Sequence, residues 1–288
     1  MVNKYSKIEE KLIFFLINTI MWGIFSTIAV VFIYLFINSI GVLNINFFFG
    51  EVNPLDVIFG IKPTYDGIWN AILGTLSIVI LSLIFSTPIG ILGGIYLSEY
   101  SKNNLIDNLI KISINLLAGL PSIIFGLFGY IIAVKTFGPC LLVGALSLSI
   151  MVLPLILKGT EESFNSLPKT YKFSSYAIGA SKWETIRYVL FPMALPNLLS
   201  GLTLAMGRCA GDVAVVMFTA ASIYSPSIGL FDRIETLPFS LYIFAMESPS
   251  PDSLNNAYGI AIILILLISF LFVCVKLFKI KKLSKLTY

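Results

Sequence analysis

The sequence predicts an all-α integral membrane protein with six transmembrane helices. Two features of its composition indicate a lipid environment: 57% of the 288 residues are apolar and only 12% are charged, against about 25% charged residues in an average soluble domain. The third observation is the spacing of the charges, which leaves several long stretches without Asp, Glu, Lys or Arg. A helix that spans a bilayer needs about 20 mostly apolar residues. The stretches that meet this requirement are residues 12–40, 68–96, 112–134, 137–157, 195–222 and 257–275.

The distribution of basic residues predicts the orientation of these spans, because loops that face the cytoplasm are enriched in Lys and Arg. With both termini on one side, fifteen basic residues fall on that side, and three, Lys62, Lys135 and Arg233, fall on the other. Both termini are therefore expected in the cytoplasm, and the protein is expected in the cell membrane. The first span follows three lysines but is too long for the core of a signal peptide, so we expect it to remain part of the protein.

The six spans divide the chain into three expected parts. Residues 1–66 contain the first span and an outer loop. Residues 67–275 form a core of five spans, with short cytoplasmic helices at about 168–191. Residues 276–288 form a basic cytoplasmic tail.

The third span contains a proline, which predicts a kink or a break. Pro121 has no amide hydrogen, so the carbonyl one turn earlier loses its helical partner. Backbone with free polar groups is tolerated at membrane depth only inside protein or along a water-filled cavity. We therefore expect this stretch to line a path through the protein, with Ser122 facing the path. The alternative interpretation is a kink that serves packing alone.

The interval between the fourth and fifth spans predicts two short helices joined by a tight turn. Gly179 suits the residue after the first helix, and Ser181 and Glu184 have the spacing of a capping box at the start of the second. Pro192 and Pro196 are expected to end that second helix. The aromatic residues of the interval have two interpretations: they rest on the lipid interface, or they fill a groove on a partner protein.

The fifth span carries two charges near its middle, where a charge costs roughly 2.5–3.5 kcal/mol on insertion scales. Arg208 and Asp212 are four residues apart, which predicts one helix face and a separation of about 6 Å along the axis. Two interpretations stay open. Either the two side chains form a structural ion pair, or Arg208 binds a passing anion and Asp212 holds the guanidinium in place when no anion is present.

The residue types argue against an enzyme. The chain has no His, and its three cysteines lack the spacing of metal ligands, so neither a metal nor a cofactor is expected in this chain. No G-x-x-x-x-G-K-[ST] loop is present to hold the phosphates of a nucleotide. Any energy from ATP must therefore come from another chain.

The segment GASKWETIRYVLFP resembles the cytoplasmic loop motif of ABC-importer permeases, in which Glu-Ala-Ala precedes a glycine and Ile-x-Leu-Pro follows. Gly179 takes the glycine position and Pro192 the proline position, while Phe173 replaces the usual Glu. This replacement removes a salt bridge to the ATPase from that position. The resemblance implies that the loop docks on an ATPase. The expected coupling residues are Lys172, Phe173, Ser174, Ser175, Gly179, Ala180 and Trp183.

Further stretches resemble the phosphate-importer permeases in particular. They are LAGLPSIIFGLFG at 117–129, LGTL at 73–76 with GIYLSEY at 94–100, and RCAGD at 208–212 with FTA at 218–220. The family usually has Glu where this chain has Asp212. Thr236-Leu237-Pro238 favours the A-type subunit over the C-type. The resemblance covers about residues 66–275 and implies the type I (MetI-like) importer permease fold.

The resemblance implies the transmembrane permease subunit of an ATP-driven phosphate importer, which transports and is not itself an enzyme. Such a subunit works with a second, C-type permease subunit, two ATPase subunits that bind ATP, and an extracytoplasmic phosphate-binding protein. It also implies that Arg208 and Asp212 matter for transport. With Ser122, which the break at Pro121 places along the path, they are the expected residues of the substrate path. One alternative is a permease for another oxyanion or small solute. Others are a proton-coupled secondary transporter or channel, disfavoured by the lack of a visible inverted repeat, and a membrane scaffold.

Overall fold

The computed structural model describes residues 2–59, 61–62, 64–102, 104–223, 225, 229–247 and 250–283. Within these residues the protein is helical, apart from one isolated β-bridge between Ala221 and Ile234. Five helices are long and apolar enough to cross a membrane, and a pair of helices bent by 99° brings the number to six when the pair is counted as one span. The predicted all-α fold with six apolar spans is confirmed, with one span broken.

The helices fall into long and short groups. The long helices are α1 (Val2–Ser39), α4 (Trp69–Ile95), α5 (Leu105–Gly119), α6 (Ser122–Lys135), α7 (Leu141–Asn165), α10 (Phe191–Ala210) and α13 (Pro251–Leu283). The short ones are α2 (Ile45–Phe49), α3 (Pro54–Ile58), α8 (Lys169–Ala177), α9 (Lys182–Glu184), α11 (Ala214–Thr219) and α12 (Leu237–Tyr242). Three π-helical turns, η1 (Tyr96–Tyr100), η2 (Thr185–Leu190) and η3 (Ile243–Glu247), extend α4, precede α10 and follow α12.

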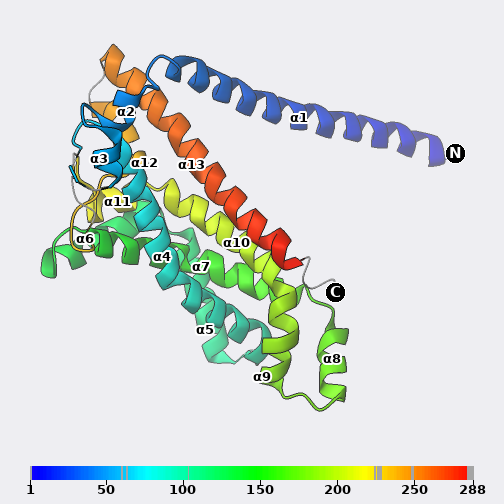
Figure 1. Ribbon diagram of the computed structural model, residues 1–288. Helices are drawn as coiled ribbons and strands as arrows, with labels where there is room; N and C mark the ends of the chain where they lie inside the picture. Colours follow the sequence, from blue (N-terminus) through cyan, green and yellow to red (C-terminus); the bar gives the residue numbers. More distant parts are fainter. Residues whose placement is uncertain are drawn as a thin grey trace.

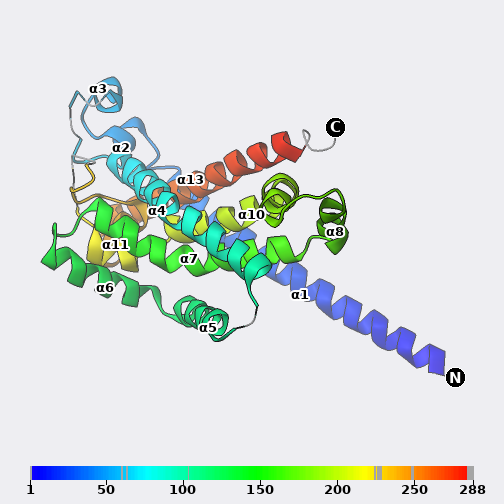
Figure 2. The ribbon, with the colours of Figure 1, turned by 90° about the horizontal axis from the view of Figure 1, so that it is seen from below.

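Helix α7 is the central helix of the bundle. It packs between α4 and α10, and α5, α6 and α11 also contact it. Leu148 and Val152 of α7 have no exposed surface, and they share the main core with Ile78 of α4 and Ala205 of α10. Figures 1 and 2 show α4, α7 and α10 side by side. These three helices form the core against which the shorter helices pack.

Helix α1 diverges from the bundle and packs against α13 (Figures 1 and 2). At this contact the hydroxyl oxygens of Tyr34 and Tyr258 lie 3.3 Å apart, and the two rings meet edge to face. Along the rest of α1 large apolar side chains such as Phe14 and Trp22 are exposed. In a membrane this surface faces lipid or another chain, because water would be unfavourable.

The two ends of the bundle carry different short helices (Figure 1). Helices α8 and α9 lie at one end, which we call the α8 end. Helices α2, α3 and α12 lie at the other, which we call the α12 end.

The predicted break at Pro121 is present. Helix α5 ends at Gly119, α6 begins at Ser122, and the two axes differ by 99°. Leu120 and Pro121 have extended backbone with ψ of 138° and 142°. This follows from the proline ring, which disfavours helical backbone at the preceding residue. The expected span 112–134 is thus two helices that meet at a sharp angle.

The fifth span differs from the expectation at both ends. Residues Lys182–Ala210 form one continuous run of helix, so Pro192 and Pro196 do not end a helix. Pro192 lies in the first turn of α10, where a missing amide hydrogen costs little, and Pro196 is accommodated inside the helix. At its far end the run stops at Gly211 rather than continuing to residue 222, and α11 begins at Ala214.

We expect Gly126→Ala to weaken the contact between α6 and α11. A Cβ atom at Gly126 would lie 2.9 Å from the Ala214 carbonyl oxygen and 3.1 Å from the Val215 Cα. Overpacking of this kind costs about 1–3 kcal/mol, so the midpoint of thermal unfolding in detergent should fall. Gly119→Ala is the control, since no atom lies within 4 Å of its Cβ position, and its midpoint should not fall. Equal midpoints for the two variants would contradict the close packing.

Candidate functional site

A helix break separates Arg208 from Asp212. Helix α10 ends just before Gly211, so the two residues do not share a helix face as expected. Asp212 instead caps α11: its Oδ1 accepts a hydrogen bond from the Val215 amide at 2.7 Å, which is the usual interaction of a residue before a helix. Within the described ranges no ion pair joins Arg208 to Asp212. The prediction that Arg208 and Asp212 share one helix face is therefore wrong, because α10 ends before Gly211 and α11 begins after Asp212.

Arg208 is exposed near the end of an apolar helix, in the last turn of α10. In the part of the chain that the structure describes, the guanidinium has no hydrogen bond or ion pair. An exposed guanidinium in an apolar span is unfavourable against lipid, so it is expected to face water or another chain. The geometry leaves all its donors available to a ligand.

Ser122 belongs to the same broken region. It is the first residue of α6 and is half-buried. One turn further along α6, Gly126 touches the first turn of α11, which is the turn that Asp212 caps. No hydrogen bond between Ser122 and either Arg208 or Asp212 occurs among the residues described. The structure thus packs together two helices, α6 and α11, that each begin just after a helix break, and among the described residues no hydrogen bond or ion pair joins the three predicted side chains.

The predicted helix, glycine turn and second helix are present at the α8 end. Gly179 follows α8 with a φ of +86°, a backbone conformation that is favourable only for glycine. Ser181 and Glu184 form the predicted capping box: the Ser181 hydroxyl accepts from the Glu184 amide, and the Glu184 carboxylate accepts from the Ser181 amide. Gly179 therefore sets the direction in which α9 leaves the turn.

Large apolar side chains project from this loop into solvent. Phe173 is 67% exposed, Trp183 is 54% exposed and Ile178 is 86% exposed. Ser174 is also exposed and Ala180 is half-buried. A cluster of exposed apolar residues marks an interaction surface more often than an ordinary solvated loop.

Two of the expected coupling residues face the chain itself. Ser175 is buried, and its hydroxyl lies 2.9 Å from that of Thr185 in η2. Lys172 forms an ion pair with Glu99 of η1, with 2.5 Å between Nζ and Oε1. Sequence analysis assigned no role to Glu99. The signal that marks it is its place as the first charge after residues 67–98, which contain none.

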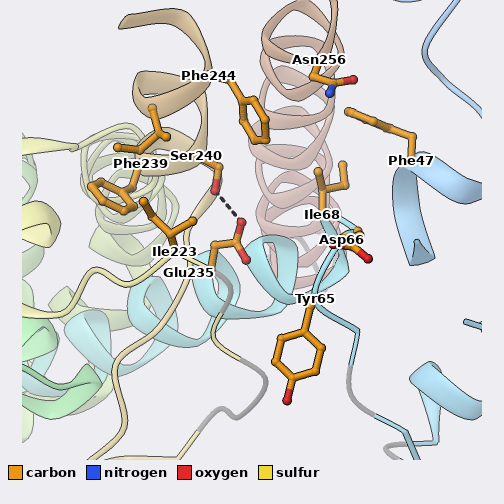
Figure 3. Close-up of a pocket in the computed structure, with 12 residues that line it drawn as sticks. Phe47, Tyr65, Asp66, Ile68, Ile223, Glu235, Phe239, Ser240, Phe244 and Asn256 are labelled. Atoms are coloured by element: carbon orange, nitrogen blue, oxygen red, sulfur yellow. Dashed lines mark hydrogen bonds between the residues drawn. The ribbon is translucent and has the colours of Figure 1, made fainter. Parts of the chain in front are cut away.

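A small pocket of about 90 Å³ lies at the α12 end (Figure 3). Its polar lining includes Glu235, Ser240 and Asn256, and Phe47 and Phe244 contribute apolar walls. The Ser240 hydroxyl donates to the Glu235 Oε1 at 2.9 Å. Glu235 is 9% exposed and lies outside the helices that could span a membrane. Burial raises the pKa of the Glu235 carboxyl, and the hydrogen bond from Ser240 opposes this only in part.

Comparison with known proteins gives one matching family model and several relatives. The model of the binding-protein-dependent transport system inner membrane component matches residues 86–279. A probable ABC transporter permease protein, YqgI of Bacillus subtilis, is 30% identical over 87% of this chain and 86% of its own. The phosphate transport system permease protein PstA of Yersinia pestis is 31% identical over 67% of this chain and 65% of its own. The protein of the same name from Haemophilus influenzae is 30% identical over 74% and 75%.

Solved structures share the fold at lower identity. A chain of the MetNI methionine ABC transporter in an inward-facing conformation has a TM-score of 0.58 and 15% identity, covering 80% of this chain and 99% of that one. A chain of a bacterial ABC transporter that imports the acidic polysaccharide alginate has a TM-score of 0.55 and 14% identity, covering 88% and 95%. The fold of this chain is therefore that of the MetI-like importer permeases.

We expect the stability of the protein to depend on the ionisation of Glu235. Its pKa is higher in the folded than in the unfolded state, so the folded state holds more protons and stability falls as pH rises above the ordinary carboxyl range. Glu235→Gln removes this penalty. Its midpoint of thermal unfolding in detergent should exceed that of the wild type at pH 8.

The difference should shrink towards pH 4, where the carboxyl of the wild type is protonated. Glu51→Gln, at an exposed carboxyl, is the control and should leave the midpoint unchanged at both pH values. A Glu235→Gln variant that is less stable than the wild type at pH 8 would show that the charge is compensated.

Proposed function

The chain belongs to the family of binding-protein-dependent transport system inner membrane components, and on this premise we propose that it is the transmembrane permease subunit of an ATP-driven phosphate importer. Its place as the transport subunit of an ABC importer follows from the family. The choice of phosphate rests on the relatives named as phosphate transport permeases, at 30–31% identity, and on the chemistry of one side chain.

Arg208 is the observation that carries the proposal. Its guanidinium is exposed at the end of an apolar helix and has no partner among the described residues. A planar guanidinium donates two parallel hydrogen bonds to two phosphate oxygens, which an ammonium group cannot do. A cation that costs several kcal/mol in lipid is stabilised when it faces a hydrated path that carries an anion. Arg208 is thus suited to a transient phosphate contact.

The two helix breaks are proposed to lie along the path on which Arg208 contacts phosphate. Irregular backbone at membrane depth is tolerated where it is buried in protein or lines a cavity, and two breaks, at 120–121 and 211–213, flank the packed α6 and α11. In this proposal Ser122 and Arg208 lie along the path. Asp212 has the different task of fixing the start of α11.

The α8 end is proposed to face the cytoplasm, as the basic residues of its loop, such as Lys169, Lys172 and Lys182, predict. There the exposed Phe173, Ile178 and Trp183 would dock on one of two partner ATPase subunits, which bind and hydrolyse the ATP. The phosphate-binding protein would meet the α12 end from outside the cell. A second, C-type permease subunit would complete the path.

We expect Arg208→Lys and Arg208→Gln to abolish most phosphate uptake while the ATPase still co-purifies. Loss of charge-assisted hydrogen bonds worth about 1.5–3 kcal/mol corresponds to a decrease of roughly 10–100-fold. Uptake of radiolabelled phosphate into proteoliposomes that contain the assembled transporter measures this. Sulfate and molybdate as competitors test whether another oxyanion is the substrate.

The control for this experiment is Asp212→Asn, because asparagine caps a helix about as well as aspartate. Its uptake should stay near that of the wild type, since the structure gives the Asp212 carboxylate a capping role. Wild-type uptake in both Arg208 variants would refute the role of Arg208. A loss in Asp212→Asn equal to that in Arg208→Lys would show that the two charges act together.

We expect Gly179→Val to uncouple ATP hydrolysis from transport. No atom lies within 4 Å of a Cβ at Gly179, so the whole cost is conformational, about 1–2 kcal/mol for left-handed backbone. Relief of this strain should redirect α9 and lower the phosphate transported per ATP. Gly138→Val is a matched control, because Gly138 also has positive φ, +80°, and open space around it but lies outside the loop. Equal values of phosphate transported per ATP for the two variants would show that the Gly179 turn does not matter for coupling.

A further inference from the structure

The loop at the α8 end is attached to the second span by two lysines. Lys172 of α8 lies 2.5 Å from the Glu99 carboxylate, whose side chain is 4% exposed. Lys182 of α9 donates to the Glu99 carbonyl oxygen at 2.5 Å and sits 4.2 Å from the centroid of the Tyr100 ring. The two lysines lie on either side of Gly179, so both arms of the turn meet the same end of the second span.

The Glu99 carboxylate depends on Lys172. Among the described residues Lys172 is its one ion-pair partner, and no other hydrogen bond reaches its buried Oε1. An exposed ion pair contributes little because water replaces either partner. Loss of Lys172 would instead leave a nearly buried carboxylate unpaired, which is unfavourable. A displacement of α8 must therefore carry Glu99 with it or break the pair.

The segment that holds Glu99 is also joined to the third span. Glu99 lies in η1, which continues α4 without interruption through Trp69–Tyr100. From the same turn Tyr96 donates to the Asp107 carboxylate at 3.0 Å. Asp107 is 1% exposed, and it also accepts from the hydroxyl of Ser101 and from the amides of Lys102 and Asn104. The turn η1 is thus bonded on one side to α8 and α9, and on the other to the start of α5.

We propose that Glu99 is the positioning residue that transmits movement of the docking loop to the spans. Displacement of α8 by the ATPase would move η1 through the Lys172 pair, and η1 would move α4 directly and α5 through Asp107. Helix α5 leads to the break at Pro121. This inference rests on the proposed function and adds a specific point of transmission within the chain, distinct from the exposed side chains that contact the ATPase.

The test compares Glu99→Gln and Lys172→Met with the exchanged pair Glu99→Lys/Lys172→Glu. The complete transporter, in proteoliposomes with its binding protein and inorganic phosphate, is assayed for ATP hydrolysis and phosphate uptake. Each single substitution should lower phosphate transported per ATP by about fivefold or more, the low end of coupling between distant sites, with the ATPase still bound. The exchanged pair should recover most of the wild-type value of phosphate transported per ATP, and Lys172→Arg should retain that value.

Lys169→Met is the matched control, because Lys169 is an exposed lysine of the same helix without an ion pair in the described chain. It should behave as the wild type. Unchanged ratios in both single variants would overturn the proposal. An exchanged pair that transports no more phosphate per ATP than the single variants would also overturn it. Loss of the ATPase from the single variants would do the same, because either result indicates that the ion pair only stabilises the loop.

The proposed function and the proposed role of the Glu99–Lys172 ion pair, which we call the clamp, fail in different ways. Absence of phosphate uptake by the wild-type assembly contradicts phosphate as substrate. In that case the stimulation of ATP hydrolysis by the binding protein reports on the clamp instead, and the single variants should lose this stimulation while Lys169→Met keeps it. Retained stimulation in the single variants would then overturn the clamp.

Discussion

A backbone amide or carbonyl inside the hydrocarbon region must have a hydrogen-bond partner, and this constraint governs both places where the spans break. At the first break Pro121 has no amide to satisfy, and its carbonyl accepts from Ile124 at 3.1 Å. At the second, the Asp212 carboxylate takes the Val215 amide, which has no partner within its own short helix. Each of these local hydrogen bonds lowers the free-energy cost of unwound backbone inside the bundle. The two restarted helices then pack on each other and on α7.

The α8 end is subject to a different constraint, because there a polar loop is joined to apolar spans. Two π-helical turns, η1 and η2, occur at this junction. Such a turn changes the phase of the helix and often lies at functional sites. The turn η1 carries Glu99, which forms an ion pair with Lys172. The turn η2 carries Thr185, whose hydroxyl is hydrogen-bonded to that of Ser175. Both contacts involve α8, so the short helix is held to the bundle at two points while its large apolar side chains stay exposed.

The sequence predicted those features that depend on interactions between residues close together in the chain. The spans follow from charge-free length, the turn at Gly179 from the freedom of glycine, and the capping box from the spacing of Ser181 and Glu184. The break after Arg208 was missed because a spacing of four residues fits a continuous helix as well as a stop followed by a cap. Tertiary packing of α11 on α6 decides between them. Glu99 and Lys172 are 73 positions apart in the numbering, and no local pattern relates them. The enclosure of Glu235 likewise depends on segments that are distant in sequence.

The contact between α1 and α13 has a consequence for biosynthesis. The tyrosines that meet there are separated by 224 positions, and the two helices lie at opposite ends of the chain. Helix α1 is made before α13, and α4, α5, α6, α7 and α10 lie between them in the chain. Helix α1 must therefore reside in the bilayer without α13 while these helices are inserted. Contacts between such distant segments form late and slowly. The contact between α1 and α13 thus forms only after the helices between them have been made.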